Sequence, residues 1–325
     1  MEDGIEQNMR TNLESKNRVL VFGAKGWIGQ KVIAILNRSP SVSVFSAKSR
    51  ADDADAVRAE INKCDATHVM SFIGRTHGEG IGTIDYLEKP DKLVENLRDN
   101  LFAPLTLADV CAERGIHYTY LGTGCIFDYD DAHTSGDETT GFKTTDAPNF
   151  FGSSYSVVKG FTDRLMRRRD HVLNVRIRMP ITDEVCPRNF ITKITSYARV
   201  CSIPNSMTVL NDLLPTMINL ALKRRVGTVN LVNPGLITHN EILELYREIV
   251  DPAFTWTNFT VDEQNMILAS KRSNNCLDTS DVVIASLPHI KDAVRRMLIQ
   301  MKTRIIEPEP QVGSKDTNSD SSQHI

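Results

Sequence analysis

The sequence is short of the features that mark membrane and nucleic-acid-binding proteins. No apolar run approaches the roughly 20 residues of a membrane-spanning helix, and the polar stretch 1–17 lacks the hydrophobic segment of a signal peptide. The net charge of −3 gives none of the basic field that nucleic-acid binders use. We therefore expect a cytoplasmic protein without membrane or nucleic-acid partners, in which an acidic substrate meets local Arg and Lys side chains.

Paired cysteines are also missing. The six cysteines show no CxxC spacing and no His-rich partner motif. This pattern predicts reduced thiols, with neither a disulfide framework nor a metal site.

What the sequence does contain is an alternation of strand and helix patterns. Short apolar runs predict strands at 18–22, 42–45, 68–73, 117–121 and 173–179. Helical periodicity separates them at 27–37, 53–63, 91–114 and 155–169. Such alternation favours right-handed βαβ units, and therefore an α/β fold with a doubly wound, parallel Rossmann sheet.

The alternation breaks down after Pro180. Helical patterns follow at 188–200, 210–225 and 240–250, with a later strand near 226–233. We expect a Rossmann domain over 18–180, to which that strand belongs, and a smaller, discontinuous substrate-binding lobe over 181–306. The polar ends 1–17 and 307–325 are expected to be disordered.

A glycine-rich turn follows the first expected strand. Its pattern is G-x-x-G-x-x-G, between that strand and a helix. The glycines allow a tight turn, so that backbone N–H groups and the helix N-terminus can receive a pyrophosphate. The strand–turn–helix setting argues against a purely structural glycine loop. The expected dinucleotide-binding residues of this turn are Gly23, Lys25, Gly26, Trp27, Ile28 and Gly29.

The residues after the second expected strand select the form of the dinucleotide. NAD-binding proteins usually place an acidic residue there, for the ribose hydroxyls. This sequence has Ser46, Lys48 and Arg50 instead, and its acidic residues begin only at Asp52. These side chains suit a 2′-phosphate, so we expect NADPH as the cofactor, with NADH as the alternative. The competing interpretation is that Lys48 and Arg50 are solvated loop charges.

Tyr155 and Lys159 form a Y-x-x-x-K pair at the start of an expected helix. Spacing i, i+4 puts both side chains on one face. An ammonium beside the hydroxyl lowers the pKa of the tyrosine, which can then pass a proton to a carbonyl oxygen while hydride reaches carbon. Both residues are also expected to contact the dinucleotide. Thr123, just past the fourth expected strand, can hydrogen-bond the same carbonyl, with a plain turn threonine as the alternative.

Together, the glycine turn, Thr123, Tyr155 and Lys159 resemble the extended short-chain dehydrogenase/reductase superfamily, in its dTDP-4-dehydrorhamnose reductase branch. The chain is more closely similar to the bifunctional nucleotide-rhamnose synthase/epimerase-reductases known from plants. The resemblance covers nearly everything between the two polar ends. Its motifs include KGWIG at 25–29, TGCIF at 123–127, DAPNF at 146–150, RMP at 178–180, PRNFITKI at 187–194 and RSNN at 272–275.

The resemblance implies a reaction. UDP-4-keto-6-deoxy-D-glucose would be inverted at C3 and C5 and then reduced at C4 with NADPH, which gives UDP-L-rhamnose. The C4 ketone acidifies the protons at C3 and C5, so one acid–base site can serve both inversions through enolates. A separate 4,6-dehydratase would supply the keto-sugar, because the chain carries one glycine fingerprint. The family resemblance also implies a homodimer through sheet-flanking helices.

An acid–base pair for the epimerisation is likewise implied by the resemblance. Carried over residue by residue, it consists of Cys125, after the T-G motif, and Lys193, in the NFITK segment. A partly exposed thiol near cations can move protons near neutral pH. Which of the two is the base stays open. The alternatives are a buried structural cysteine and a helix-surface lysine.

Candidate substrate contacts lie in three segments, at 74–86, 187–194 and 272–275. The segment 74–86 departs from the plant pattern and holds His77, which titrates near neutrality. Arg188 precedes an expected helix, where an arginine can bind a diphosphate. A solvated loop histidine and surface arginines are the alternatives. The expected substrate-binding residues are Thr76, His77, Arg188, Asn189, Phe190, Arg272 and Asn275.

Two other functions fit the same residues. One is a dTDP-4-dehydrorhamnose reductase without epimerase activity. The other is a non-catalytic binding subunit of the same fold, as in the regulatory subunit of methionine adenosyltransferase. Intact Thr123, Tyr155, Lys159, Cys125 and Lys193 argue against a pure binder, which needs neither acid–base set.

Overall fold

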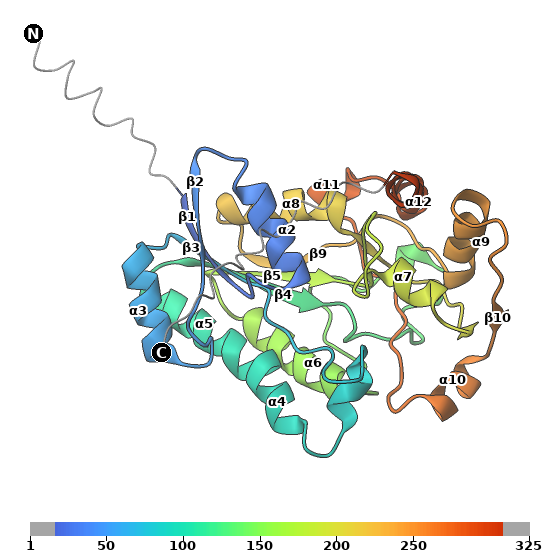
Figure 1. Cartoon of the computed structure of the whole chain (residues 1–325). Coiled ribbons are helices and arrows are strands. Elements are labelled where there is room, and N and C mark those ends of the chain that lie inside the picture. The colour runs from blue at the N-terminus through green and yellow to red at the C-terminus, as the bar shows by residue number, and fades with distance from the viewer. Residues whose placement is uncertain (1–16, 308–325) are drawn as a thin grey trace, which may run out of the picture.

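A parallel sheet forms the centre of the computed structural model, which describes residues 17–307 (Figure 1). Its strand order is β2-β1-β3-β4-β5-β9, and every neighbouring pair is parallel. The strands are β1 (Asn17–Phe22), β2 (Val42–Ser46), β3 (His68–Ser71), β4 (His117–Thr123), β5 (Val172–Ile177) and β9 (Gly227–Asn230). β2 and β3 flank β1, so the loops after β1 and β3 diverge at the switch point where such sheets bind ligands. The expected doubly wound Rossmann fold is confirmed.

Helices cover both faces of this sheet (Figure 1). α3 (Ala54–Cys64), α5 (Ala103–Glu113) and α6 (Ser154–Met166) lie on one side, and α2 (Trp27–Leu36) and α8 (Leu210–Leu222) on the other. In β1, Val19 and Val21 enter the core under α2 and α8, whereas Leu20 and Phe22 enter the opposite core. Burial on both faces explains why these strands are continuous apolar runs in the sequence.

The prediction of a single helix at 91–114 is wrong in one respect, because a π-helical turn interrupts the helix. α4 (Leu93–Leu97) continues into η3 (Arg98–Phe102), and α5 starts only at Ala103. Pro104 has no N–H, so it cannot donate to the carbonyl of Asn100 four residues earlier. That carbonyl accepts a hydrogen bond from Thr162 Oγ1 of α6 instead, at 2.7 Å. The interruption thereby attaches η3 to α6.

Parts of the chain after residue 180 pack around a separate apolar cluster, beyond the carboxyl ends of the strands (Figure 1). Ile191, Ile194, Ile242, Leu243 and Val294 are among its fully buried members. The elements not yet given are η2 (Ile84–Glu88), η4 (Glu138–Thr140), β6 (Pro180–Ile181), α7 (Phe190–Thr195), β7 (Arg199–Val200), β8 (Thr208–Val209), α9 (His239–Ile249), β10 (Thr257–Asn258), α10 (Val261–Ile267), α11 (Val282–Ala285) and α12 (Ile290–Ile306). The division of the chain near residue 180 stays a prediction.

The helix expected at 188–200 is shorter than its pattern indicates. α7 covers only Phe190–Thr195, and Arg199–Val200 form β7, which pairs in parallel with β10. The partner strand lies nearly sixty residues later in the sequence, so local periodicity cannot reveal it.

Two observations concern residues 17–307 alone. No helix there is both long and apolar enough to pass through a membrane. No group of three or more His, Cys, Asp or Glu side chains is arranged there to bind a metal ion. The expected disorder of the two ends concerns residues that lie, except for Asn17 and Glu307, outside this range.

Candidate active site

The glycine turn between β1 and α2 has no room for side chains. Gly23 has a φ of +74°, and a Cβ there would lie 2.9 Å from the carbonyl carbon of Phe72. A Cβ on Gly29 would lie 2.2 Å from the carbonyl oxygen of Gly23. Gly26 is the N-cap of α2, and no side chain caps the helix. The turn therefore brings backbone N–H groups and a helix N-terminus to the switch point, which fits a dinucleotide pyrophosphate.

The other predicted residues of this turn divide into two kinds. Lys25 is exposed, at the mouth of the turn. Trp27 and Ile28 pack against the core under α2 and α8. The Trp27 indole donates to Glu184 at 3.4 Å, and Glu184 also binds Lys31 at 2.5 Å. This contact ties α2 to the loop before α7.

The loop after β2 presents cations to solvent. Ser46, Lys48 and Arg50 are all exposed. Glu60 accepts hydrogen bonds from the backbone N–H groups of Lys48 at 2.7 Å and Ser49 at 2.9 Å, which fixes the loop backbone. The Arg50 guanidinium contacts Asp52 at 2.9 Å. Glu60 also accepts a hydrogen bond from the Ser49 hydroxyl. Within residues 17–307 no ion pair engages the Lys48 ammonium, which leaves it available for an anionic group such as a 2′-phosphate.

Thr123 and Tyr155 meet at the carboxyl end of β4. Thr123 is the last residue of β4, and Tyr155 lies in the first turn of α6, whose N-cap is Ser153. The Thr123 side chain hydrogen-bonds Tyr155. Burial raises the pKa of Tyr155, the negative charge of Cys125 adds to that effect, and the bond from Thr123 opposes it. The site therefore holds a protonated phenol beside a hydroxyl.

The position of Lys159 corrects one expectation from the sequence. Its ammonium donates to the hydroxyl of Tyr120 at 2.5 Å and to the carbonyl of Leu121 at 3.3 Å. No hydrogen bond joins Lys159 to Tyr155 among the described residues, and the pKa of Tyr155 is raised rather than lowered. The i, i+4 spacing does place both residues on the buried face of α6, but Tyr120 of β4 takes the ammonium.

Cys125 lies in the same site as these three residues. Its backbone N–H donates to Thr123 Oγ1 at 3.0 Å. Its charge contributes to the pKa values of both Tyr155 and Lys159, raising each. The side chain is half-buried, and Arg178 Nη1 lies 3.7 Å from its sulfur. Thr123, Cys125, Tyr155 and Lys159 are thus brought together.

Lys193 of α7 belongs to a second, cationic group, together with Arg188 just before α7 and His77 in the loop after β3. Its Nζ donates to the carbonyl of Gly82 at 3.4 Å, and no hydrogen bond joins it to Cys125 within residues 17–307. Burial lowers the pKa of Lys193, and the positive charge of Arg188 lowers it further. Arg188 in turn contacts the His77 ring, whose pKa is lowered by burial and then by Arg188. In the described chain no carboxylate forms an ion pair with Arg188, Lys193 or His77.

The remaining predicted substrate contacts are engaged inside the protein. Arg272 forms an ion pair with Asp85 and also donates to Ser270. Thr76 bonds its neighbour His77 at 3.3 Å, and Phe190 packs edge-on against His239.

The structure gives two predicted substrate residues other roles. Asn275 is fully buried and donates to the carbonyls of Gly124 and Phe127, both at 2.9 Å. Asn189, also fully buried, caps α7 and donates to the carbonyl of Thr182 at 2.9 Å. Because their amide donors are used within the chain, we assign both a supporting role. Asn275 shapes the turn that carries Cys125.

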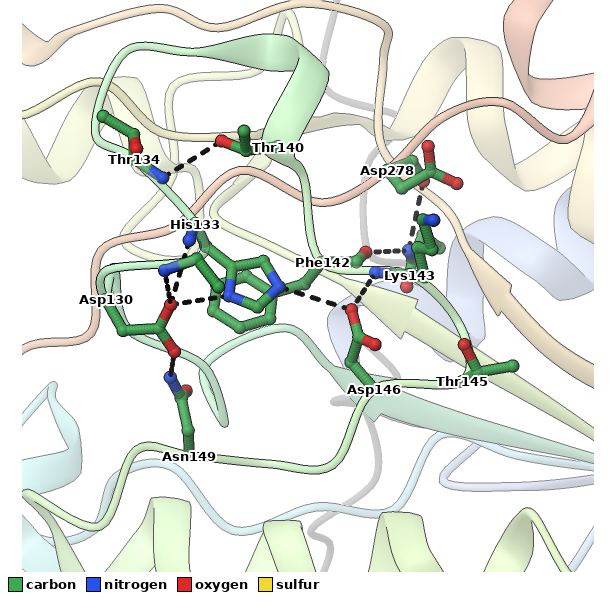
Figure 2. A network of polar contacts seen from close by, with 12 residues as sticks. Asp130, His133, Thr134, Thr140, Phe142, Lys143, Thr145, Asp146, Asn149 and Asp278 are labelled. Atoms are coloured by element: carbon green, nitrogen blue, oxygen red, sulfur yellow. Dashed lines mark hydrogen bonds and ion pairs between the residues drawn. The ribbon is translucent and has the colours of Figure 1, made fainter.

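The long loop between β4 and α6 is held by a polar network that sequence patterns did not indicate. Figure 2 shows the His133 ring stacked on Phe142, between two carboxylates. Its Nδ1 lies 2.7 Å from Asp130 and its Nε2 3.5 Å from Asp146. This loop begins next to Cys125 and ends just before Tyr155, so the network fixes the segment that joins them.

The chain is similar to known proteins in sequence and in fold. Residues 19–182 match the NAD dependent epimerase/dehydratase family. A protein of Acanthamoeba polyphaga mimivirus is 54% identical over 286 residues, which are 87% of this chain and 98% of that protein. The chain belongs to the NAD dependent epimerase/dehydratase family.

Among members of this family, plant enzymes are also similar. A bifunctional dTDP-4-dehydrorhamnose 3,5-epimerase/dTDP-4-dehydrorhamnose reductase of Arabidopsis thaliana is 42% identical over 80% of this chain and 85% of the relative. A crystal structure of a UDP-rhamnose synthase from Acanthamoeba polyphaga mimivirus has a TM-score of 0.83 and 54% identity, and covers 87% of this chain and 99% of that one. A dTDP-4-dehydrorhamnose reductase of Bacillus anthracis, in complex with NADP, has a TM-score of 0.73, covers 88% of this chain and 99% of that chain, and shares 15% identity, which shows the fold alone.

Proposed function

We propose that this family member is a bifunctional 3,5-epimerase/4-reductase that converts UDP-4-keto-6-deoxy-D-glucose to UDP-L-rhamnose with NADPH. The observation that carries the proposal is the position of Cys125 beside the Thr123–Tyr155 pair. Reduction of a ketone uses the phenol and the hydroxyl, whereas a second proton-transfer group serves only the epimerisation. The similarity to a UDP-rhamnose synthase over nearly its full length supports the same assignment.

The chain supplies binding and proton transfer for the reduction. The glycine turn and the cations Lys48 and Arg50 would hold NADPH, which supplies hydride to C4 when bound. Tyr155 then gives its phenolic proton to the C4 oxygen, so its O–H bond breaks as the new O–H bond forms. The Thr123 hydroxyl orients the ketone. The phenolate regains its proton from solvent.

Inversion at C3 and C5 requires proton removal from one face of the ring and proton return on the other. The C4 ketone stabilises the enolate formed in between. Cys125 follows β4 and Lys193 lies on α7, and we assign them to opposite faces of one ring. Burial lowers the pKa of Lys193, which lets it exchange a proton closer to neutral pH than an ordinary lysine.

The nucleoside diphosphate fits the cationic group on α7 and the loop after β3. Arg188, Lys193 and His77 gather there without a carboxylate ion pair in the described chain. A diphosphate is negatively charged and can pair with these side chains in place of a carboxylate. A guanidinium can bind it through two N–H donors. Arg188 is therefore assigned to the diphosphate.

The face formed by α4, η3 and α6 suits a homodimer. These elements contact one another on one side of the sheet. They expose large apolar side chains, of which Val94 is 74% and Phe161 is 54% exposed. An apolar face of this kind marks an association surface. A Phe161→Asp variant should be monomeric in light scattering where the unmodified chain is dimeric; equal masses would contradict the dimer.

The deciding experiment is incubation of the full chain with UDP-4-keto-6-deoxy-D-glucose and NADPH in D2O, with NMR of the product. UDP-L-rhamnose carrying deuterium at C3 and C5 is the expected product. Reduction without exchange would instead favour the reductase-only alternative, with dTDP-4-dehydrorhamnose as substrate. Neither reduction nor exchange would favour a non-catalytic binding subunit. The keto-sugar is supplied ready-made here, as a separate 4,6-dehydratase would supply it in the cell.

A further inference from the structure

A second tyrosine, Tyr120, holds the lysine of the Y-x-x-x-K pair. Tyr120 lies on β4, three residues before Thr123, with its side chain under α6. Its hydroxyl accepts a hydrogen bond from Lys159 Nζ at 2.5 Å, and its ring centroid is 4.5 Å from the same atom. The Leu121 carbonyl accepts from Lys159 at 3.3 Å. The Lys159 ammonium is therefore held by the hydroxyl and the ring of Tyr120, and by the carbonyl of Leu121.

This pair is sealed from solvent. Tyr120 is fully buried and Lys159 is 3% exposed. Burial lowers the pKa of Lys159 to about 7, against the opposing negative charges of Asp163 and Cys125. Burial also raises the pKa of Tyr120 far above its ordinary value, so its phenol stays protonated and can only accept from the ammonium through its oxygen. At neutral pH the protonation of Lys159 is thus finely balanced, and each contact with the ammonium matters.

We propose that Tyr120 is a positioning residue for the reduction: it keeps Lys159 charged and fixes the ammonium below the face of α6 that also carries Tyr155. The inference rests on the proposed function. When Tyr155 gives its proton to the C4 oxygen, a phenolate is left in a buried site. A charged Lys159 stabilises that phenolate by attraction, whereas a neutral lysine does not. Tyr120 takes no part in the bonds that change.

Reduction at C4 and epimerisation at C3 and C5 use different side chains. Reduction depends on Tyr155 and Lys159, whereas exchange at C3 and C5 depends on Cys125 and Lys193. Loss of the Tyr120 hydroxyl should therefore impair reduction and leave exchange in place. A general defect of folding would reduce both rates together.

Two conservative variants test this. Tyr120→Phe removes the hydroxyl but keeps the ring, and Tyr118→Phe is the matched control. Tyr118 lies two residues earlier on the same strand, is equally buried, and makes no hydrogen bond to Lys159. Reduction by the full chain is followed by NADPH oxidation from pH 5 to pH 9, and exchange by deuterium incorporation in D2O.

For Tyr120→Phe we expect the alkaline fall of the reduction rate to move to lower pH by about one unit, the effect of one hydrogen bond to a charged group. The reduction rate at pH 7.5 should fall about tenfold while exchange stays within about twofold of the unmodified chain. Tyr118→Phe should leave both unchanged. An unshifted pH profile, an equal loss of reduction and exchange, or a faster reduction would overturn the proposal.

A direct titration of Lys159 keeps this inference distinct from the proposed function. The ¹³Cε resonance of the lysine is followed against pH in the unmodified chain and in Tyr120→Phe, without substrate. A lower titration midpoint in the variant supports the role of Tyr120, and equal midpoints refute it. A chain that neither reduces nor epimerises the keto-sugar would refute the proposed function, while the titration would still decide what Tyr120 does to Lys159.

Discussion

The guanidinium of Arg178 lies 3.7 Å from the sulfur of Cys125, and none of its hydrogen-bond partners within residues 17–307 is a carboxylate. Ser273 accepts from it at 2.8 Å and Asn205 at 2.5 Å. Arg178 is fully buried, and burial lowers its pKa, with the charge of Cys125 as the largest opposing influence. A positive charge thus stands at the sulfur to which the epimerisation is assigned.

Cys125→Ala should abolish epimerisation and spare reduction. Removing one acid–base group costs typically 10²- to 10⁴-fold in the step that it serves. We therefore expect loss of deuterium incorporation at C3 and C5, measured by NMR, while reduction of a keto-sugar that is already inverted continues. Cys64→Ala, on the distant α3, serves as the control and should retain both activities. Undiminished exchange in Cys125→Ala would disprove the assignment.

Arg188→Ala should weaken substrate binding more than turnover. A hydrogen bond to a charged group contributes about 1.5–3 kcal/mol, which corresponds to a rise in KM of about 10- to 100-fold. Steady-state kinetics with the nucleotide sugar measures this change, with Arg295→Ala as the control because Arg295 pairs with Glu248 on the surface. A lower kcat at constant KM would instead place Arg188 at the reacting centre.

Sequence patterns predicted the parts of the site that are local. The glycine turn, Thr123 and the Tyr155–Lys159 spacing each lie within one strand end or one helical turn, so their geometry follows from regular secondary structure. The interruption of the helix expected at 91–114 was missed, although Pro104 carries a local signal for it, because a proline cannot complete the hydrogen bond to Asn100.

Contacts between distant segments could not be predicted in the same way. Arg178 reaches Cys125 across 53 residues, and His77 reaches Arg188 across 111. Such pairs depend on the order of the strands and the course of the loops. The buried amide of Asn275 shows the converse error, since its type and position suggested a ligand contact while its partners are backbone carbonyls.

The stability of the fold should fall in mild acid because of His68. This ring is 1% exposed, and burial, followed by the charges of Arg224 and His117, lowers its pKa to about 4. The unfolded chain binds this proton near pH 6.5, whereas the folded chain does not until about pH 4. The contribution of His68 to the free energy of unfolding is therefore complete above pH 6.5. It is lost as the pH falls towards 4, by up to about 3 kcal/mol.

Replacement of that ring isolates the effect. In His68→Phe the free energy of unfolding, measured by urea denaturation at several pH values, should depend less steeply on pH between 6.5 and 4. The comparison concerns the slope, so a constant offset from altered packing does not disturb it. Parallel curves for the two chains would show that His68 is not responsible.

Removing one partner of the buried Arg176–Asp163 ion pair should lower the stability of the fold, whereas replacing both partners with apolar residues should lower it much less. Arg176 of β5 binds the Asp163 carboxylate of α6 through Nη2 at 2.7 Å and Nε at 2.9 Å, and both residues are almost fully buried. Arg176→Met leaves an uncompensated carboxylate in the core and should cost about 3–5 kcal/mol. The double variant Arg176→Met, Asp163→Leu should recover most of that loss, because it removes both charges. Urea denaturation measures all three stabilities, and a double variant no more stable than the single one would contradict the argument.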